Sequence, residues 1–233
     1  KSVINLLIML AFFFVKMVPP IVCAVVLFHL ANERMQYIFR IIFVLPMIIP
    51  WMVFILIWKF LYQPAPYGAF NRILIAIGLE NLTQNWLANP KTALGAVIFL
   101  GFPWFSTIGV LIYLAGLQNI SESVYDAAKI DGANALQRFF YVEFPLILRQ
   151  IKINLVLGIV NLIQTYNLIL VLTGGPGRTA GGPLYSTSVP GLRMYLEAFE
   201  NGRYGYASTI GFVLFITILV LTLINVKFIR PKD

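Results

Sequence analysis

The sequence has little charge. Only 11% of its 233 residues are Asp, Glu, Lys or Arg, whereas 60% are hydrophobic and the mean hydropathy is +0.85. Soluble domains carry about 25% charged residues, so a water-soluble globular protein is excluded. The net charge of +8 comes from basic residues beside apolar runs, where positive charge sets the orientation of membrane segments. We therefore expect a membrane protein that binds no nucleic acid.

The sequence is also poor in the residues that build catalytic and metal sites. It has one cysteine, Cys23, and one histidine, His29, which excludes a disulfide framework and disfavours a Ser-His-Asp set or a metal cluster. No G-x-x-x-x-G-K-[ST] phosphate loop occurs. We expect no catalytic residue, metal or cofactor on this chain. His29 is interpreted as an interfacial hydrogen-bonding group rather than a proton relay.

What the sequence does have is five long apolar runs. A helix of about 20 residues crosses a hydrocarbon core about 30 Å thick, and the runs lack the period-two alternation of barrel strands. The predicted fold is all-α, a polytopic membrane helical bundle with residues 1–233 as one domain. The runs are residues 4–31, 38–62, 92–117, 146–172 and 205–229.

All nine acidic residues lie outside those runs. Ion-coupled carriers usually hold ionisable groups inside the bilayer, so a transporter of this composition would take its energy from a partner. Lys16 lies near the middle of the first run, close to Pro19 and Pro20, which we expect to interrupt that helix. Two interpretations of Lys16 stay open: a charge in a translocation path, and a side chain that snorkels toward water.

The distribution of basic residues predicts an orientation. The short turn after the first run and the C-terminal tail are basic, whereas segments 63–90 and 173–204 are long, sparsely charged and rich in Gly, Pro and Asn. Cytoplasmic segments carry an excess of Lys and Arg, so residues 118–145 and the C-terminus are predicted to be cytoplasmic. Segments 63–90 and 173–204 would be periplasmic loops.

Residues 118–145 carry the most informative local pattern. Ser123 is expected to cap a short helix, with Asp126 completing a start that resembles a capping box. The two alanines that follow keep one face small, so that another protein surface can approach closely. Gly132 supplies the left-handed residue that ends the helix, and a second short helix is expected before Pro145 opens the next span.

This pattern resembles the cytoplasmic signature of the permease subunits of binding-protein-dependent ABC importers, in the class that moves maltose, glycerol-3-phosphate and oligosaccharides. Asp126 and Phe144 stand where the family usually has Glu and Leu, and Val142 stands for Ile. Further motifs agree along the chain, at residues 40–46, 86–90, 172–176 and 195–207. The signature positions that match here are Ala127, Ala128, Ile130, Asp131, Gly132, Ala133, Phe139 and Pro145.

The resemblance implies a type I ABC importer transmembrane domain in a bacterial cytoplasmic (inner) membrane, with a further core span before Lys1. The expected partners are a second, non-identical permease, two copies of a cytoplasmic ATPase that binds ATP and Mg²⁺, a periplasmic or lipid-anchored solute-binding protein, and membrane lipid. The permease would not itself be an enzyme. Residues 118–145 would be the loop that couples it to the ATPase, with residues 123–140 making the contact.

A sugar path needs polar and aromatic side chains at membrane depth. The fourth run offers Asn161, Gln164 and Thr165 at the spacing of one helix face, followed by Tyr166. The resemblance adds three residues around a break at 101–103. These are Leu100, Gly101 and Trp104. An alternative stays open, because polar side chains also hold membrane helices together.

The main competing interpretation is a membrane scaffold or channel subunit whose cytoplasmic loop only docks a partner. A channel needs a pore-lining ring contributed by several copies, whereas the resemblance implies a pair of permeases on two ATPases. The periplasmic loops are likewise open to two interpretations, a docking surface for the solute-binding protein and a lid over a pore.

Overall fold

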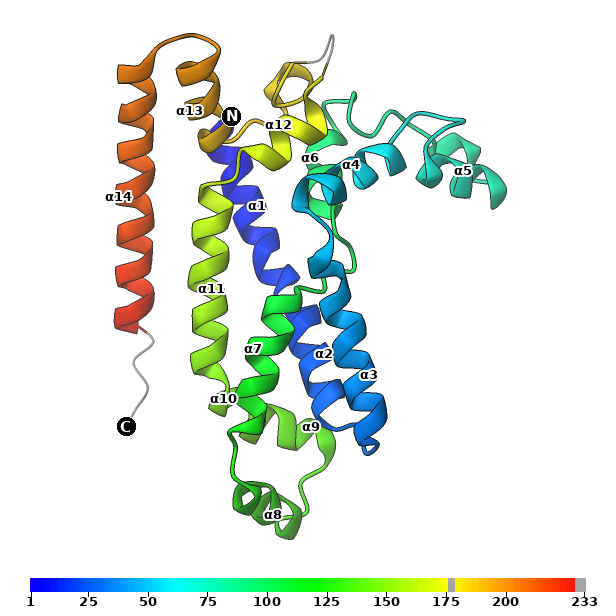
Figure 1. Cartoon of the computed structure of the whole chain (residues 1–233), viewed down its shortest axis with the longest axis vertical. Helices are drawn as coiled ribbons and strands as arrows, with labels where there is room; N and C mark the ends of the chain where they lie inside the picture. The colour runs from blue at the N-terminus through cyan, green and yellow to red at the C-terminus, as the bar shows by residue number, and fades with distance from the viewer. Residues whose placement is uncertain (176–178, 229–233) are drawn as a thin grey trace. The chain divides into compact units, whose positions relative to one another are not determined.

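The computed structural model describes residues 1–175 and 179–228, and every regular element in these ranges is a helix (Figure 1). The prediction of an all-α protein is confirmed for this part of the chain. Pro176, which belongs to one of the motifs above, and the basic tail from residue 229 onward lie outside the described residues.

The chain divides into two compact units. The first comprises Lys1–Phe13, Ile49–Phe102 and Ile159–Leu221, and the second comprises Phe14–Ile48, Pro103–Gly158 and Thr222–Asp233. Three helices contribute residues to both units: α1 (Ser2–Lys16), α11 (Leu148–Ile163) and α14 (Tyr204–Phe228).

The first unit is built around an aromatic and aliphatic core. Ile55, Trp58 and Leu172 are buried in it, and Tyr62 donates a hydrogen bond from its hydroxyl to the Ala96 carbonyl at 2.8 Å. Segments 63–90 and 173–204, expected as loops, contain short helices of their own. The elements that lie wholly in this unit are α4 (Trp51–Leu61), α5 (Ala69–Ala76), η2 (Glu80–Leu82), α6 (Ala93–Phe99), α12 (Asn167–Thr173), η4 (Pro183–Tyr185) and α13 (Pro190–Phe199).

The second unit is organised by α2 packed along α7. Small residues allow the close approach: Ala24 is fully buried, and a Cβ added at Gly109 would lie 3.3 Å from the Pro20 Cβ. Small residues are typical of helix contacts inside membranes. The elements of this unit are α2 (Val18–Phe28), α3 (Glu33–Val44), η1 (Leu45–Ile48), α7 (Thr107–Gln118), α8 (Glu122–Ile130), α9 (Ala135–Arg138), η3 (Phe139–Glu143) and α10 (Phe144–Leu146).

Four of the five apolar runs are interrupted helices, and only the fifth forms one unbroken helix, α14. The predicted interruption at Pro19 and Pro20 is confirmed: α2 begins at Val18, so both prolines lie in its first turn, where missing N–H groups cost little. The predicted break at residues 101–103 is also confirmed, with Gly101 at φ +80°. Among the described residues, two stretches are long and apolar enough to span a membrane: Ser2–Phe28, which contains α1 and α2, and Tyr204–Asn225 of α14. If each of two sharply bent helix pairs is also counted as one span, the number rises to four.

Candidate functional site

The segment predicted to bind a partner, residues 118–145, is a helical hairpin of short elements in the second unit (Figure 1). Its first helix, α8, begins two residues earlier than expected. Ser121 is the N-cap, and its side chain makes no capping bond. The prediction that Ser123 caps the helix and that Asp126 completes the cap is therefore wrong. Ser123 instead pairs with the Ser121 hydroxyl at 3.0 Å, and Asp126 pairs with Lys129 at 3.1 Å on the exposed surface.

The turn after α8 is confirmed. Gly132 has φ +71°, in the left-handed region that glycine occupies at little cost. Its N–H donates to the Lys129 carbonyl, and the Ala133 N–H donates to the Ala128 carbonyl, both at 3.0 Å. This pair of bonds is the Schellman motif, which satisfies carbonyls left over at a helix end. The turn at Gly132 is therefore fixed by backbone hydrogen bonds.

The start of the second helix, α9, is also fixed by hydrogen bonds, in a motif that was not predicted from the sequence. Asn134 Oδ1 accepts the Gln137 N–H and Gln137 Oε1 accepts the Asn134 N–H, each at 2.9 Å. This reciprocal capping box starts α9. The chain then continues through the π-helix η3 and through α10, which holds Pro145 in its first turn. A 65° bend precedes α11, so Pro145 does not open the next span directly.

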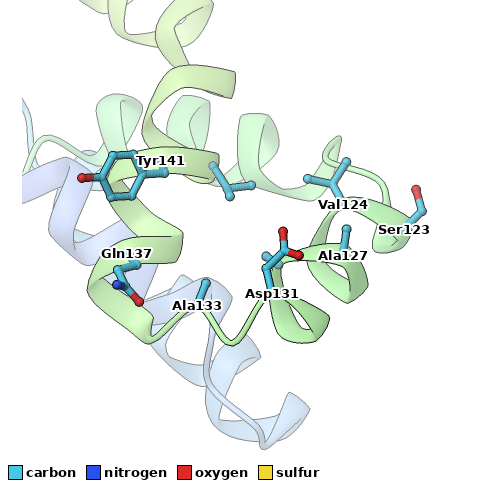
Figure 2. Close-up of a pocket in the computed structure, with 9 residues that line it drawn as sticks. Ser123, Val124, Ala127, Asp131, Ala133, Gln137 and Tyr141 are labelled. Atoms are coloured by element: carbon cyan, nitrogen blue, oxygen red, sulfur yellow. The ribbon is translucent and has the colours of Figure 1, made fainter.

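Together α8 and the returning segment enclose a hollow of about 420 Å³. Figure 2 shows Val124, Ala127 and Asp131 on one side of it and Gln137 and Tyr141 on the other. Of the other predicted contact residues, Ala128 is buried, Ala133 and Phe139 are partly buried, and Pro145 is exposed.

Large apolar side chains stand in solvent around this hairpin. Ile130 is 86% exposed, Leu136 is 70% exposed and Tyr141 is 80% exposed. Several large apolar side chains exposed on one segment outside the apolar runs indicate a protein-binding site. We call residues Ile130, Leu136, Phe140 and Tyr141 the apolar tip.

At the base of the hairpin lies a buried ionic cluster. Glu143 is 1% exposed, and its Oε1 accepts hydrogen bonds from His29 Nε2 at 2.6 Å and from Arg138 Nε at 3.1 Å. The ring of Tyr125 lies 5.7 Å from the ring of Phe28 and 6.3 Å from that of His29. Burial, reinforced by the Glu143 charge, raises the pKa of Tyr125 to about 12. His29 is thus a hydrogen-bonding group, as the sequence suggested, with a buried carboxylate as its partner.

The residues proposed for a sugar path divide between the units. Leu100 is buried in the core of the first unit, and a Cβ added at Gly101 would lie 3.7 Å from the Phe54 ring. Trp104 belongs to the second unit, where it has φ +61° and where the Lys16 ammonium lies 5.6 Å from the centre of its ring. That distance is within the range of a cation–π contact.

The polar residues of the fourth run do not share one helix face. The helix α11 ends at Ile163, and residues 164–166 are a break before α12. Asn161 and Gln164 are exposed, and Tyr166 is 36% exposed and stacks on Tyr195 of α13 at 5.0 Å between ring centres. The helical spacing misled because nothing in residues 164–166 is a Gly or Pro that would signal the break.

Comparison with known protein families matches residues 29–232 to the binding-protein-dependent transport system inner membrane component. The chain belongs to this family. Among curated relatives of this inner membrane component, it is 34% identical over 193 residues to the probable ABC transporter permease protein YurN of Bacillus subtilis, covering 82% of this chain and 63% of the relative. It is 31% identical over 198 residues to the trehalose/maltose transport system permease protein MalF of Thermococcus litoralis, covering 84% and 64%.

The chain therefore spans less than two thirds of the length of these relatives. The chain is also similar to a solved structure, that of a bacterial ABC transporter involved in the import of the acidic polysaccharide alginate. The alignment covers 97% of this chain and 77% of that transporter chain. The TM-score is 0.83 and the identity 21%. This likeness establishes the fold as that of a type I ABC importer transmembrane domain.

The Glu143 cluster was not predicted from the sequence, because His29 lies 114 residues away from Glu143 in the chain. One signal was available: Glu143 lies two residues before Pro145, between apolar residues on both sides. A carboxylate in such surroundings is retained only when it has a partner.

The role of the capping box at the start of α9 can be tested by mutation. Replacing Asn134 by Ala should destabilise α9 by about 1 kcal/mol, since one N-cap bond is lost. Amide hydrogen exchange measured by mass spectrometry should then be about fivefold faster over residues 135–138. Asn32→Ala, which removes the N-cap of α3, should leave exchange in α9 unchanged. Equal exchange in Asn134→Ala and the unmodified protein would contradict the structural role given to the capping box.

Proposed function

We propose that this chain is the membrane-spanning permease subunit of an ATP-driven importer for a sugar or oligosaccharide, and that it forms half of the translocation pathway. It is not itself an enzyme. Family membership and the names of its relatives, which include a trehalose/maltose permease, support this function. The permease takes its energy from a cytoplasmic ATPase through the hairpin of α8 and α9.

The observation that carries the proposal is the construction of that hairpin. The Schellman turn at Gly132 and the capping box at Asn134 fix its shape with backbone and side-chain bonds. The side chains of the apolar tip, by contrast, are exposed and belong to neither hydrophobic core. A rigid element with an exposed apolar end suits the transmission of force from a partner. Asp126, Ala127 and Asp131 also lie on its exposed surface.

The assembly that follows has this chain beside a second, non-identical permease, over two copies of the ATPase that bind ATP and Mg²⁺. A solute-binding protein docks on segments 63–90 and 173–204. Residues 118–145 and the C-terminus face the cytoplasm of a bacterial inner membrane. One solved structure that aligns over 95% of this chain, with a TM-score of 0.80, is an alginate ABC transporter in complex with its alginate-bound periplasmic protein.

For the substrate, a sugar fits the polar and aromatic groups at the break between α11 and α12. The exposed amides of Asn161 and Gln164 can exchange hydrogen bonds with hydroxyl groups. The stacked rings of Tyr166 and Tyr195 offer an apolar face beside them. Thr165, Leu100 and Gly101 are further candidates in the same unit, and Trp104 is a separate candidate in the second unit.

Gly132 provides a test of the coupling role. A Cβ there meets nothing within 4 Å, so Gly132→Leu adds bulk only on the side of the partner, together with backbone strain of about 1 kcal/mol. In the purified complex, ATP hydrolysis stimulated by the solute-binding protein should fall by at least tenfold.

The matched control is Gly132→Ala, because it puts a side chain at the same φ of +71° but adds only a Cβ, which has nothing within 4 Å. It should carry the same strain and keep the stimulation. Full stimulation in Gly132→Leu would rule out the hairpin as the coupling contact. If no ATPase co-purifies with the unmodified chain, the scaffold or channel interpretation is favoured instead.

The sugar path has its own test. Asn161→Ala and Gln164→Ala should each raise the KM for uptake about two- to tenfold, since each removes a hydrogen bond of about 0.5–1.5 kcal/mol. Uptake into proteoliposomes of radiolabelled maltose, trehalose and maltotriose measures this. Ser208→Ala, at an exposed position of α14 outside the proposed path and docking segments, should leave KM unchanged. Transport of none of these sugars by the unmodified complex, or a KM unaffected by both variants, would count against the proposed path.

A further inference from the structure

The buried cluster at the base of the hairpin consists of Glu143, His29 and Arg138, and neither Glu143 nor His29 belongs to the predicted contact with the ATPase, residues 123–140. A carboxylate that loses its water is stabilised only by close partners, and Glu143 finds them on two different elements. His29 ends α2 and Arg138 ends α9, and both bond the same oxygen, Oε1. The returning limb of the hairpin is thereby fastened to α2 at a buried point.

The packing around Glu143 leads directly into the core of the second unit. Phe28 and Phe139 pack against the hydrophobic core of this unit, which contains Leu27, Leu117 and Ile147. Ile147 is fully buried. A displacement of Glu143 therefore moves residues of α2, α7 and the start of α11 together. An apolar residue of the same size would pack there without directing the helices into one orientation.

Two polar atoms of the cluster have no partner among the described residues. They are the second carboxylate oxygen, Glu143 Oε2, and the Tyr125 hydroxyl, and both are buried. Buried polar atoms without partners are rare and costly. Both flank His29, whose ring centre lies 6.3 Å from that of Tyr125 and whose Nε2 lies 2.6 Å from Glu143 Oε1. With its pKa raised to about 12, the Tyr125 hydroxyl keeps its proton and can donate it.

Tyr125 lies on α8, the limb of the hairpin that carries the predicted partner contact, whereas Glu143 lies on the returning limb. A movement of α8 that carries the Tyr125 hydroxyl to Glu143 Oε2 would pair this donor with this acceptor. In the structure, Glu143 bonds His29 and Arg138 through Oε1. A second arrangement, in which Oε2 also accepts the Tyr125 hydroxyl, is open to it because both atoms lack a partner among the described residues.

We propose that Glu143 is a positioning residue that links the hairpin to α2: Oε1 holds His29 and Arg138 at all times, and Oε2 accepts the Tyr125 hydroxyl when the ATPase partner is in its nucleotide-bound state. This rests on the proposed function, since it assigns the path by which force from the ATPase reaches α2. The hairpin and the end of α2 then move as one body.

The test measures a distance inside the full chain in its complex, reconstituted in lipid nanodiscs. Spin labels on Ser123→Cys and Arg34→Cys, both exposed, report the separation of α8 from the start of α3, in a background where Cys23 is replaced by Ser. Pulsed electron resonance is recorded without nucleotide and after trapping with ATP and vanadate. The unmodified cluster should give one narrow distance distribution in each state.

Two variants separate the two halves of the proposal. Glu143→Gln weakens the bonds to His29 and Arg138, so the distribution should broaden in both states and stimulated ATP hydrolysis should fall about tenfold. Tyr125→Phe keeps the ring and removes only the hydroxyl, so it should match the unmodified protein without nucleotide and broaden only in the trapped state. The KM for ATP should stay unchanged in both, because neither residue is on the ATPase.

The controls are Glu33→Gln and Tyr37→Phe, the same chemical changes at exposed positions of α3, and both should match the unmodified protein. A narrow, unchanged distribution for Tyr125→Phe in the trapped state would overturn the proposal, even if Glu143→Gln fails to assemble. If the unmodified chain binds no ATPase, the proposed function fails. Broadening by Glu143→Gln without nucleotide would then still support the link to α2.

Discussion

The structure depends on one constraint, that backbone groups surrounded by apolar material must find hydrogen-bond partners within the protein. Four of the apolar runs contain breaks, and each break releases carbonyl groups that the next turn of helix would have bonded. Side chains take over this task. Lys59 Nζ donates to the Val171 and Gly174 carbonyls at the end of α12, each at 2.6 Å. Thr107 donates to the Phe43 carbonyl at 2.7 Å, where α3 gives way to η1.

These bonds explain why irregular backbone is tolerated at the breaks. Broken helices in membranes occur where the backbone is covered by protein or lines a water-filled path. The break at residues 164–166 exposes Gln164 and Tyr166, and the break after α6 places Gly101 and Trp104 in left-handed conformations. Strained conformations of this kind gather at functional sites. The same breaks that complicate the spans thus provide the polar surface proposed for a sugar.

Much of this could be predicted from the sequence, and the exceptions have a physical reason. Composition and run length predict helices, and Gly132, Pro19 and the Gly101 break follow from the backbone preferences of Gly and Pro. The break at residues 164–166 could not be predicted, since it depends on packing: α13 approaches so closely that a Cβ on Gly191 would lie 2.8 Å from the Thr165 carbonyl oxygen. The start of α8 was misplaced because Ser121 and Ser123 are both of a residue type that favours the N-cap position. The pairing of His29 with Glu143 joins residues far apart in the chain, and no local pattern contains it.

The central claim is that the apolar tip of the hairpin contacts a cytoplasmic ATPase. Its most direct test is site-specific photocrosslinking in intact cells, with a benzophenone amino acid in place of Leu136, which is 70% exposed. The account predicts a covalent adduct between this chain and one nucleotide-binding subunit. An adduct with lipid alone, or labelling of the same position by a membrane-impermeant reagent added outside the cell, would contradict it.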